Sequence, residues 1–282
     1  PSIQIIHGDS SKDIKELVKD NSINNVSCSP YYFKMKVYDE DNKLNKKIKN
    51  SKNDYGFENS IQDYIKGLMP IFSEIDRVTN KTGNVFINIM DSYIGGVQQR
   101  IPDKMINEIE RSLSLKFKQF IYWYKRNPTP HSVDGKKFQP VQEYIMHFVK
   151  DTKDHQWRTD WYGTEDKFLN DVTFGQNGKA KNFKNVIVYP ELTNNKVEIG
   201  KTEGLIQTNS CNNSYIKNLL DRHGFSLQHN ALFPIEVPLI LMLTTCHKGD
   251  TVLDPFNGIG TTGVASYVSG CNYIGVELSQ VY

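Results

Sequence analysis

The chain has 282 residues, of which 38% are hydrophobic and 23% charged, with a net charge of +2 at pH 7 and a mean hydropathy of −0.53. This length suffices for one large α/β domain or two small ones, and the composition argues against a disordered chain. The longest apolar run, Val237 to Leu243, is interrupted by Pro238. It is far shorter than the ~20 residues that cross a bilayer, so neither a transmembrane helix nor a membrane partner is expected.

The lack of a visible signal peptide and the spacing of the cysteines indicate the cytoplasm. The first residues show neither the basic nor the apolar region of a signal peptide. The four cysteines, Cys28, Cys211, Cys246 and Cys271, lie far apart and form no CxxC pair. This pattern argues against a zinc ribbon or a disulfide scaffold, so no metal is expected and the cytoplasm is the expected location.

The hydrophobic pattern predicts an α/β domain interrupted by a region of different character. In chain order, the expected elements are a strand over 3–6, a helix over 10–20, a strand from Val26, a helix with an apolar face over 61–75, a strand over 85–89 that follows a stop at Gly83, a helix near 103–112, strands near 117–124 and 143–149, a helix over 235–246, a strand over 251–253, a helix over 261–269 and a strand over 273–276. Between 170 and 218 Asn and Gly become frequent and the periodicity fades.

Three regions follow from this pattern. Residues 1–149 and 229–282 are expected to build one α/β domain. Residues 150–228 are expected to be an inserted, loop-rich region with a function of its own. The chain ends five residues after Glu277, where such a sheet normally continues into a helix, so a further helix is expected to follow.

A glycine loop near the end of the chain predicts a nucleoside site. Asp254 to Gly263 follows a strand and opens a helix, and Gly258 and Gly260 allow a close approach of the backbone to a ligand. Glu277 ends the next strand, at the position where an acidic residue holds ribose hydroxyls. The alternative is an ordinary turn between a strand and a helix. Phe256 with the two glycines, after Asp-Pro, resembles the S-adenosylmethionine loop of amino-methylating DNA methyltransferases, and this resemblance implies that cofactor.

A second motif, Ser29-Pro30-Tyr31-Tyr32, follows the strand that begins at Val26. It resembles the Ser/Asp/Asn-Pro-Pro-aromatic motif of the same family, with Tyr31 in place of the second proline. An exocyclic amine can attack a methyl sulfonium once acceptors hold its protons, and Ser29 and the Pro30 carbonyl can supply them. Tyr32 is expected to stack on a base flipped out of the duplex. The alternative is a strand-ending turn with two packing tyrosines.

The order of the motifs resembles that of the permuted, beta-group DNA amino-methyltransferases, because the tetrapeptide precedes the glycine loop. The resemblance implies a Rossmann-like methyltransferase fold: a mostly parallel twisted sheet with helices on both faces, in circularly permuted order, plus a recognition insertion. It also implies that 1–149 is the first, catalytic part of the domain, 229–282 its cofactor-binding part and 150–228 the target-recognition region. Asp9 would contact the cofactor adenine, although it is equally suited to cap a helix. The expected cofactor-binding residues are His7, Asp9, Phe233, Pro234, Asp254, Pro255, Phe256, Gly258, Gly260, Thr261, Thr262 and Glu277. Gln142 and Asn230 stand where the family has His and Pro.

The first residue of the tetrapeptide favours one substrate. In the family, Ser or Thr accompanies N4-cytosine methylation, and Asp or Asn accompanies N6-adenine methylation. The sequence therefore indicates a cytosine-N4 DNA methyltransferase of a restriction-modification system, acting with a cognate endonuclease. The alternatives are N6-adenine methylation, an RNA or protein methyltransferase, and a DNA-binding module whose catalytic site has decayed.

Basic segments provide the expected contacts to double-stranded DNA. Residues 34–52 carry a net charge of +4 and residues 115–137 a net charge of +5. Their alternative interpretation is a solvated, lysine-rich surface. The segment 34–56 is expected to close over the flipped base. The candidate DNA-binding residues are Lys34, Lys36, Lys46, Lys47, Lys125, Arg126, Arg158, Gln176, Asn177, Lys179 and Lys181.

Overall fold

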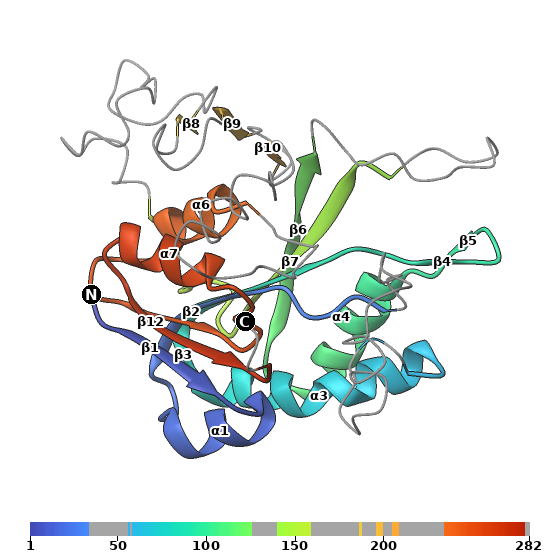
Figure 1. The fold of residues 1–282 in the computed structure, drawn as a ribbon, viewed down its shortest axis with the longest axis horizontal. Coiled ribbons are helices and arrows are strands. Elements are labelled where there is room, and N and C mark those ends of the chain that lie inside the picture. Colours follow the sequence, from blue (N-terminus) through green and yellow to red (C-terminus); the bar gives the residue numbers. More distant parts are fainter. Residues whose placement is uncertain are drawn as a thin grey trace, which may run out of the picture.

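A computed structural model of the chain describes residues 1–33, 56, 58–125, 140–158 and 234–279, and the backbone of three short strands between 186 and 208. Ten strands form one sheet in the order β1-β12-β11-β2-β3-β7-β6-β10-β9-β8 (Figure 1). They are β1 (Ile3–His7), β2 (Ile23–Cys28), β3 (Thr79–Ile89), β6 (Lys116–Lys125), β7 (Gln142–Val149), β8 (Val186–Ile187), β9 (Lys196–Ile199), β10 (Leu205–Thr208), β11 (Thr251–Asp254) and β12 (Asn272–Glu277). A separate hairpin pairs β4 (Tyr93–Ile94) with β5 (Val97–Gln98).

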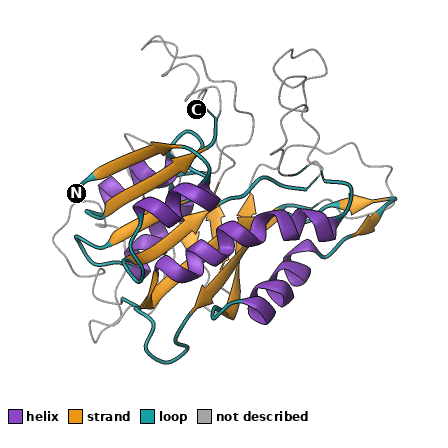
Figure 2. Cartoon of the chain, turned by 90° about the horizontal axis from the view of Figure 1, so that it is seen from below, coloured by secondary structure: helices purple, strands orange, loops and turns teal. Residues whose placement is uncertain are grey.

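Helices cover both faces of the sheet, as the ribbon seen from below makes clear (Figure 2). One face carries α1 (Ser10–Leu17), α3 (Ile61–Val78) and α4 (Ile101–Ser112), and the other carries α6 (Glu236–Thr245) and α7 (Thr261–Val268). Strand β3 shows why two cores form. Its alternate side chains Val85 and Ile87 join the core under α3, whereas Phe86 points to the other face and joins the core with α6.

The two ends of the described chain meet in the sheet. Strand β1 pairs in parallel with β12, and β11 lies between β12 and β2, again in parallel. From β11 the chain proceeds through α7 to β12 on one side, and from β2 it proceeds to β3 on the other. The sheet order therefore reverses between β11 and β2, and ligands of open α/β sheets bind outside the carboxyl ends of the strands at such a point.

Strand β3 begins earlier than its sequence suggests. The prediction that this strand follows a stop at Gly83 is wrong, because β3 starts at Thr79 and contains the glycine. The pairing with β2 is irregular between Ile23 and Asn25, and a Cβ on Gly83 would approach Thr79 Cγ2 to 2.7 Å and the Ile23 carbonyl to 3.1 Å. Gly83 therefore lies inside a strand at a point where the backbones of β3 and β2 come close together, and a side chain would have no room there.

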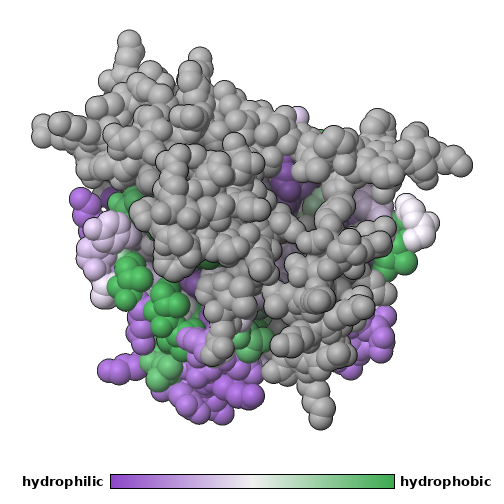
Figure 3. Space-filling view, viewed as in Figure 1, coloured by the Kyte–Doolittle hydropathy of each residue, from purple (hydrophilic) through white to green (hydrophobic). Residues whose placement is uncertain are grey.

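The edge strand β1 leaves apolar side chains at the surface. Ile3 and Ile5 are 47% and 55% exposed, and Figure 3 shows hydrophobic residues gathered on the side of the molecule where β1 lies.

In the described part of the chain, no helix is long and apolar enough to cross a membrane. Cys28, Cys246 and Cys271 are buried free thiols.

Candidate functional site

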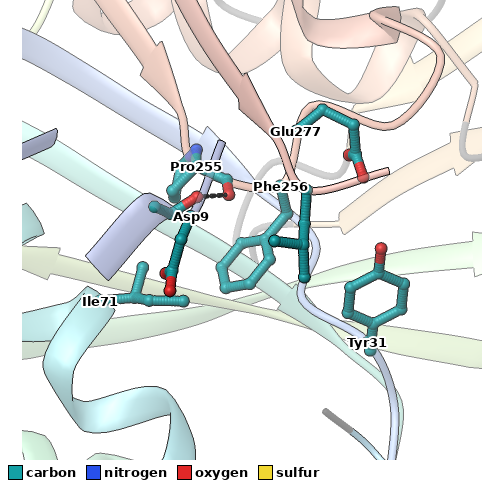
Figure 4. A pocket seen from close by; sticks show the side chains of 8 residues that line it. Asp9, Tyr31, Ile71, Pro255, Phe256 and Glu277 are labelled. Atoms are coloured by element: carbon teal, nitrogen blue, oxygen red, sulfur yellow. Dashed lines mark hydrogen bonds between the residues drawn. The ribbon is translucent and has the colours of Figure 1, made fainter. Parts of the chain in front are cut away.

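A pocket that is partly open to solvent lies at the carboxyl ends of β1, β2, β11 and β12. Its lining consists of Asp9, Ser10, Tyr31, Ile71, Pro255, Phe256, Glu277 and Leu278. Figure 4 shows the Phe256 ring in the middle of this set, with Asp9 and Tyr31 on either side of it. The pocket therefore brings together residues of the glycine loop and of the tetrapeptide, which lie more than 200 positions apart in the sequence.

The glycine loop has the backbone conformation that its composition predicts. Gly258 and Gly260 adopt φ angles of +50° and +83°, a region that other residues rarely enter, and Gly260 is the N-cap of α7. Glu277 holds this loop from the neighbouring strand. One of its carboxylate oxygens accepts a hydrogen bond from the Gly258 amide at 2.7 Å, and the other accepts one from the Ser279 amide at 2.9 Å. The Glu277 side chain is thereby fixed in the wall of the pocket.

Asp9 and Ser10, which follow β1, line the same pocket as Glu277. Asp9 caps α1, accepting hydrogen bonds from the amide and the hydroxyl of Ser11 at 3.0 and 2.7 Å. Burial favours the protonated form of Asp9, but the hydrogen bonds from Ser11 and Lys12 outweigh it and lower its pKa, so the group is ionised at neutral pH. Next to it, Ser10 Oγ donates to the Pro255 carbonyl at 2.5 Å, the bond drawn in Figure 4. Asp9 is thus both a helix cap and a lining residue of the pocket.

The two tyrosines of the tetrapeptide point in different directions. Tyr31 is 40% exposed and lines the pocket, and its carbonyl accepts a hydrogen bond from Tyr64 Oη at 2.6 Å. This bond restrains the backbone at the position where the related motif has a second proline. Tyr32 is half-buried and its hydroxyl is directed into the protein, while Ser29 is half-buried and Pro30 buried.

A group of buried polar side chains surrounds the Tyr32 hydroxyl, and the sequence patterns did not reveal it. Tyr32 Oη donates to Glu143 Oε2 at 2.5 Å, and Asn88 Nδ2 donates to both of these oxygens, at 2.8 and 2.7 Å. The other Glu143 oxygen lies 2.5 Å from Lys125 Nζ. Lys125 was predicted to contact DNA, and its contact with Glu143, like that of Asn88, follows only from their positions in adjacent strands.

Other predicted residues do not line the pocket. His7 is exposed at the end of β1, Pro234 is buried just before α6, and Thr261 and Thr262 form the first turn of α7. Ser10, Ile71 and Leu278 line the pocket but were not predicted. Ile71 belongs to the apolar face of α3, and nothing in helical spacing distinguishes a side chain that reaches a ligand site from one that only fills the core.

Of the predicted DNA-binding residues, only Lys125 and Arg158 belong to the described part. Lys125 pairs with Glu143 and packs over the Trp123 ring. Arg158 donates from its guanidinium to the Cys246 carbonyl and from its amide to the Thr244 carbonyl, so it binds the carboxyl end of α6. Outside the described residues lie Lys34, Lys36, Lys46, Lys47, Arg126, Gln176, Asn177, Lys179 and Lys181, as does the predicted cofactor contact Phe233.

Asp254, at the end of β11, makes the stability of the fold depend on pH. Burial raises its pKa from an ordinary 3.8 to about 7, and the nearby charge of Glu277 adds to the rise, although the Phe256 amide donates to it at 2.9 Å. The folded protein therefore favours the neutral acid. The stabilisation of the fold by neutral Asp254 is fully present below about pH 4 and is lost as the pH rises through about 7.

We expect the free energy of unfolding to fall between pH 5 and pH 8 by about 3 kcal/mol through this one group. Asp254→Asn should remove most of that fall, because an amide does not ionise. Urea unfolding at the two pH values measures the effect, and Asp63→Asn on the surface of α3 is the control. An unchanged pH dependence in Asp254→Asn would show that another group is responsible.

The chain is similar to known proteins in sequence and in fold. A family model described as DNA methylase, for N6 and N4 methyltransferases, matches residues 23–282. The chain is 29% identical to the type II methyltransferase M.MthZI of Methanothermobacter thermautotrophicus, over 98% of this chain and 73% of the relative. It is 24% identical to the type II methyltransferase M.Cfr9I of Citrobacter freundii, over 99% and 84% of the two chains.

Solved structures share the fold at lower identity. The PvuII DNA methyltransferase (cytosine-N4-specific) superposes with a TM-score of 0.68 at 15% identity, over 99% of this chain and 83% of that one. A putative DNA modification methylase from Thermus thermophilus, solved with S-adenosyl-L-methionine, superposes with a TM-score of 0.57 at 17% identity, over 99% and 89% of the two chains.

Proposed function

The chain belongs to the N6/N4 family of DNA methylases, and we propose that it transfers a methyl group from S-adenosylmethionine to the N4 amine of a cytosine in duplex DNA. The fold is the Rossmann-like methyltransferase fold in permuted order that the sequence predicts. The observation that carries the proposal is the shared pocket: Tyr31 of the tetrapeptide lines it together with Phe256 and Glu277 of the cofactor segments.

The pocket fits the chemistry of S-adenosylmethionine, the cofactor of this family. Phe256 offers an apolar ring face suited to an adenine, and the ionised Asp9 offers an acceptor for its amine. The Glu277 oxygens each accept one backbone amide and keep lone pairs for ribose hydroxyls. When bound, the cofactor supplies an electrophilic methyl group.

The tetrapeptide would orient the nucleophile. The lone pair of an exocyclic amine is delocalised into the base, so the nitrogen attacks well only when acceptors hold its protons. In our proposal Ser29 Oγ and the Pro30 carbonyl are these acceptors, at the carboxyl end of β2 and next to the end of β11. The tyrosine rings of the motif supply faces on which an extruded base can stack.

The choice of cytosine rests on Ser29. The neutral hydroxyl suffices as an acceptor for the cytosine amine, and the motif with Ser in the first position accompanies N4 methylation in the family. The PvuII enzyme, whose fold this chain shares, is cytosine-N4-specific. These two observations support N4 over N6 methylation.

The type II methyltransferases among the relatives support a role in restriction-modification. We infer that the chain acts in the cytoplasm and protects DNA from a cognate endonuclease. In this proposal residues 150–228 read the target sequence, as a recognition region inserted in the α/β domain that residues 1–149 and 229–282 build. The lysines of 34–52 and the basic residues of 115–137 other than Lys125 contact phosphates, so DNA affinity should fall with salt.

The test is methyl transfer in vitro by the purified full chain. Labelled S-adenosylmethionine is supplied with plasmid DNA, RNA or protein, and the labelled product is digested and identified. Label in DNA as N4-methylcytosine supports the proposal. Label in RNA or protein, or in DNA as N6-methyladenine, overturns the proposed substrate.

A further inference from the structure

The buried group around the Tyr32 hydroxyl is assembled from four neighbouring strands. Tyr32 follows β2, Asn88 lies near the end of β3, and Lys125 ends β6. Glu143 lies near the start of β7, which runs antiparallel to both neighbours. Because β7 is reversed, its first residues lie at the same edge as the last residues of the parallel strands, beside the tetrapeptide.

The charges in this group are balanced. Glu143 is 4% exposed and Asn88 is 3% exposed, and a buried carboxylate is tolerated only when it is paired and hydrogen-bonded. Lys125 Nζ neutralises one Glu143 oxygen at 2.5 Å, and Tyr32 and Asn88 donate to the other. The lysine predicted to contact DNA thus has a partner inside the protein.

The direction of each hydrogen bond follows from which atoms carry protons. An ionised carboxylate only accepts, so the single Tyr32 hydroxyl proton points to Glu143. The Asn88 amide donates to Tyr32 Oη, at 2.8 Å. Toward Ser29, whose Oγ is 3.4 Å away, the Tyr32 oxygen can therefore act only as an acceptor.

We propose that Glu143 is a positioning residue for the transfer reaction. By accepting the Tyr32 proton, it makes Tyr32 Oη an acceptor for the Ser29 hydroxyl proton. The lone pairs of Ser29 Oγ are then left to accept a proton of the target amine. This inference rests on the proposed function, in which Ser29 orients that amine.

The experiment is a double-mutant cycle between Glu143→Gln and Tyr32→Phe in the full chain. A glutamine can donate to Tyr32, which allows the tyrosine proton to turn toward Ser29, and Tyr32→Phe removes the hydroxyl that transmits the effect. We expect Glu143→Gln alone to lower kcat for DNA methylation by about 10- to 100-fold, the equivalent of one hydrogen bond to a charged group. The KM for S-adenosylmethionine should stay within about twofold, because Glu143 does not line the pocket.

The decisive result is the loss caused by Glu143→Gln in the Tyr32→Phe background, which should be less than about threefold. Glu108→Gln, on the outer surface of α4, is the matched control and should leave kcat unchanged. Thermal unfolding checks that each variant is folded. The role of Glu143 would be overturned if Glu143→Gln lowered kcat equally in the wild-type and Tyr32→Phe backgrounds. A rise in KM without a fall in kcat would overturn it as well. A wild-type chain that methylates no DNA would instead refute the proposed function, and the inference with it.

Discussion

Replacing Ser29 with alanine should reduce the single-turnover rate of DNA methylation on the order of 100-fold, with little change in cofactor binding. The hydroxyl sits at the carboxyl end of β2, within 3.4 Å of the Tyr32 hydroxyl, and it is one of the two acceptors proposed for the target amine. Removing one preorganised hydrogen-bonding partner of a reacting group typically costs about 10²–10³ in rate. Ser29 does not line the pocket, so the Kd for S-adenosylmethionine should stay within about twofold.

Single-turnover kinetics and equilibrium dialysis separate these two effects. Ser22→Ala is the matched control, because Ser22 is an exposed serine just before β2 whose hydroxyl donates to the Lys19 carbonyl. A Ser29→Ala protein that methylates DNA at the wild-type rate would show that the tetrapeptide is only a turn. Loss of cofactor binding in that variant would show that the serine supports the pocket instead.

Replacing Glu277 with alanine should weaken S-adenosylmethionine binding on the order of 100-fold. The side chain is 5% exposed, lines the pocket, and fixes the glycine loop through the Gly258 amide. The substitution therefore removes the proposed ribose acceptor and also leaves the Gly258 amide without its partner. A hydrogen bond to a charged group contributes about 1.5–3 kcal/mol, so the loss of one or two such bonds accounts for the expected change.

Glu110→Ala separates the ligand effect from a general loss of structure. Glu110 also accepts a hydrogen bond from a backbone amide, that of Phe117 at 3.0 Å, but it lies on α4 and does not line the pocket. Isothermal titration should show wild-type affinity in Glu110→Ala and weak binding in Glu277→Ala. Equal affinities in the two variants would contradict the assignment of this pocket to the cofactor.

Local sequence signals predicted the parts of the site that depend on neighbouring residues. Gly258 and Gly260 have positive φ angles, which composition alone suggested, and the strand after them ends in the acidic residue that the motif requires. Periodicity also predicted the order of the main helices and strands outside residues 150–228, because α1, α3 and α4 each have one apolar face and the central strands β2 and β3 are largely buried. The hairpin of β4 and β5 was not predicted. Asp9 suited two roles in the sequence, and in the structure it caps α1 and lines the pocket.

Contacts between distant strands could not be predicted in this way. Glu143 meets Tyr32 only because β7 runs against its neighbours, and one sequence carries no signal for that direction. Gly83 was predicted to be a break between elements, whereas it lies inside β3 and allows the backbone there to approach that of β2. Tyr31 lines the pocket, whereas the Tyr32 hydroxyl points into the protein, and the tetrapeptide alone does not encode this difference. The stacking of Tyr32 on the base stays a prediction.

Nucleoside mass spectrometry tests the central claim most directly. DNA from cells that express the full-length protein, or its Ser29→Ala variant, is digested and searched for methylated bases. The account predicts N4-methylcytosine with the wild-type protein and a much lower level with the variant. N6-methyladenine in its place, or an N4-methylcytosine level that is unchanged in Ser29→Ala, would contradict it.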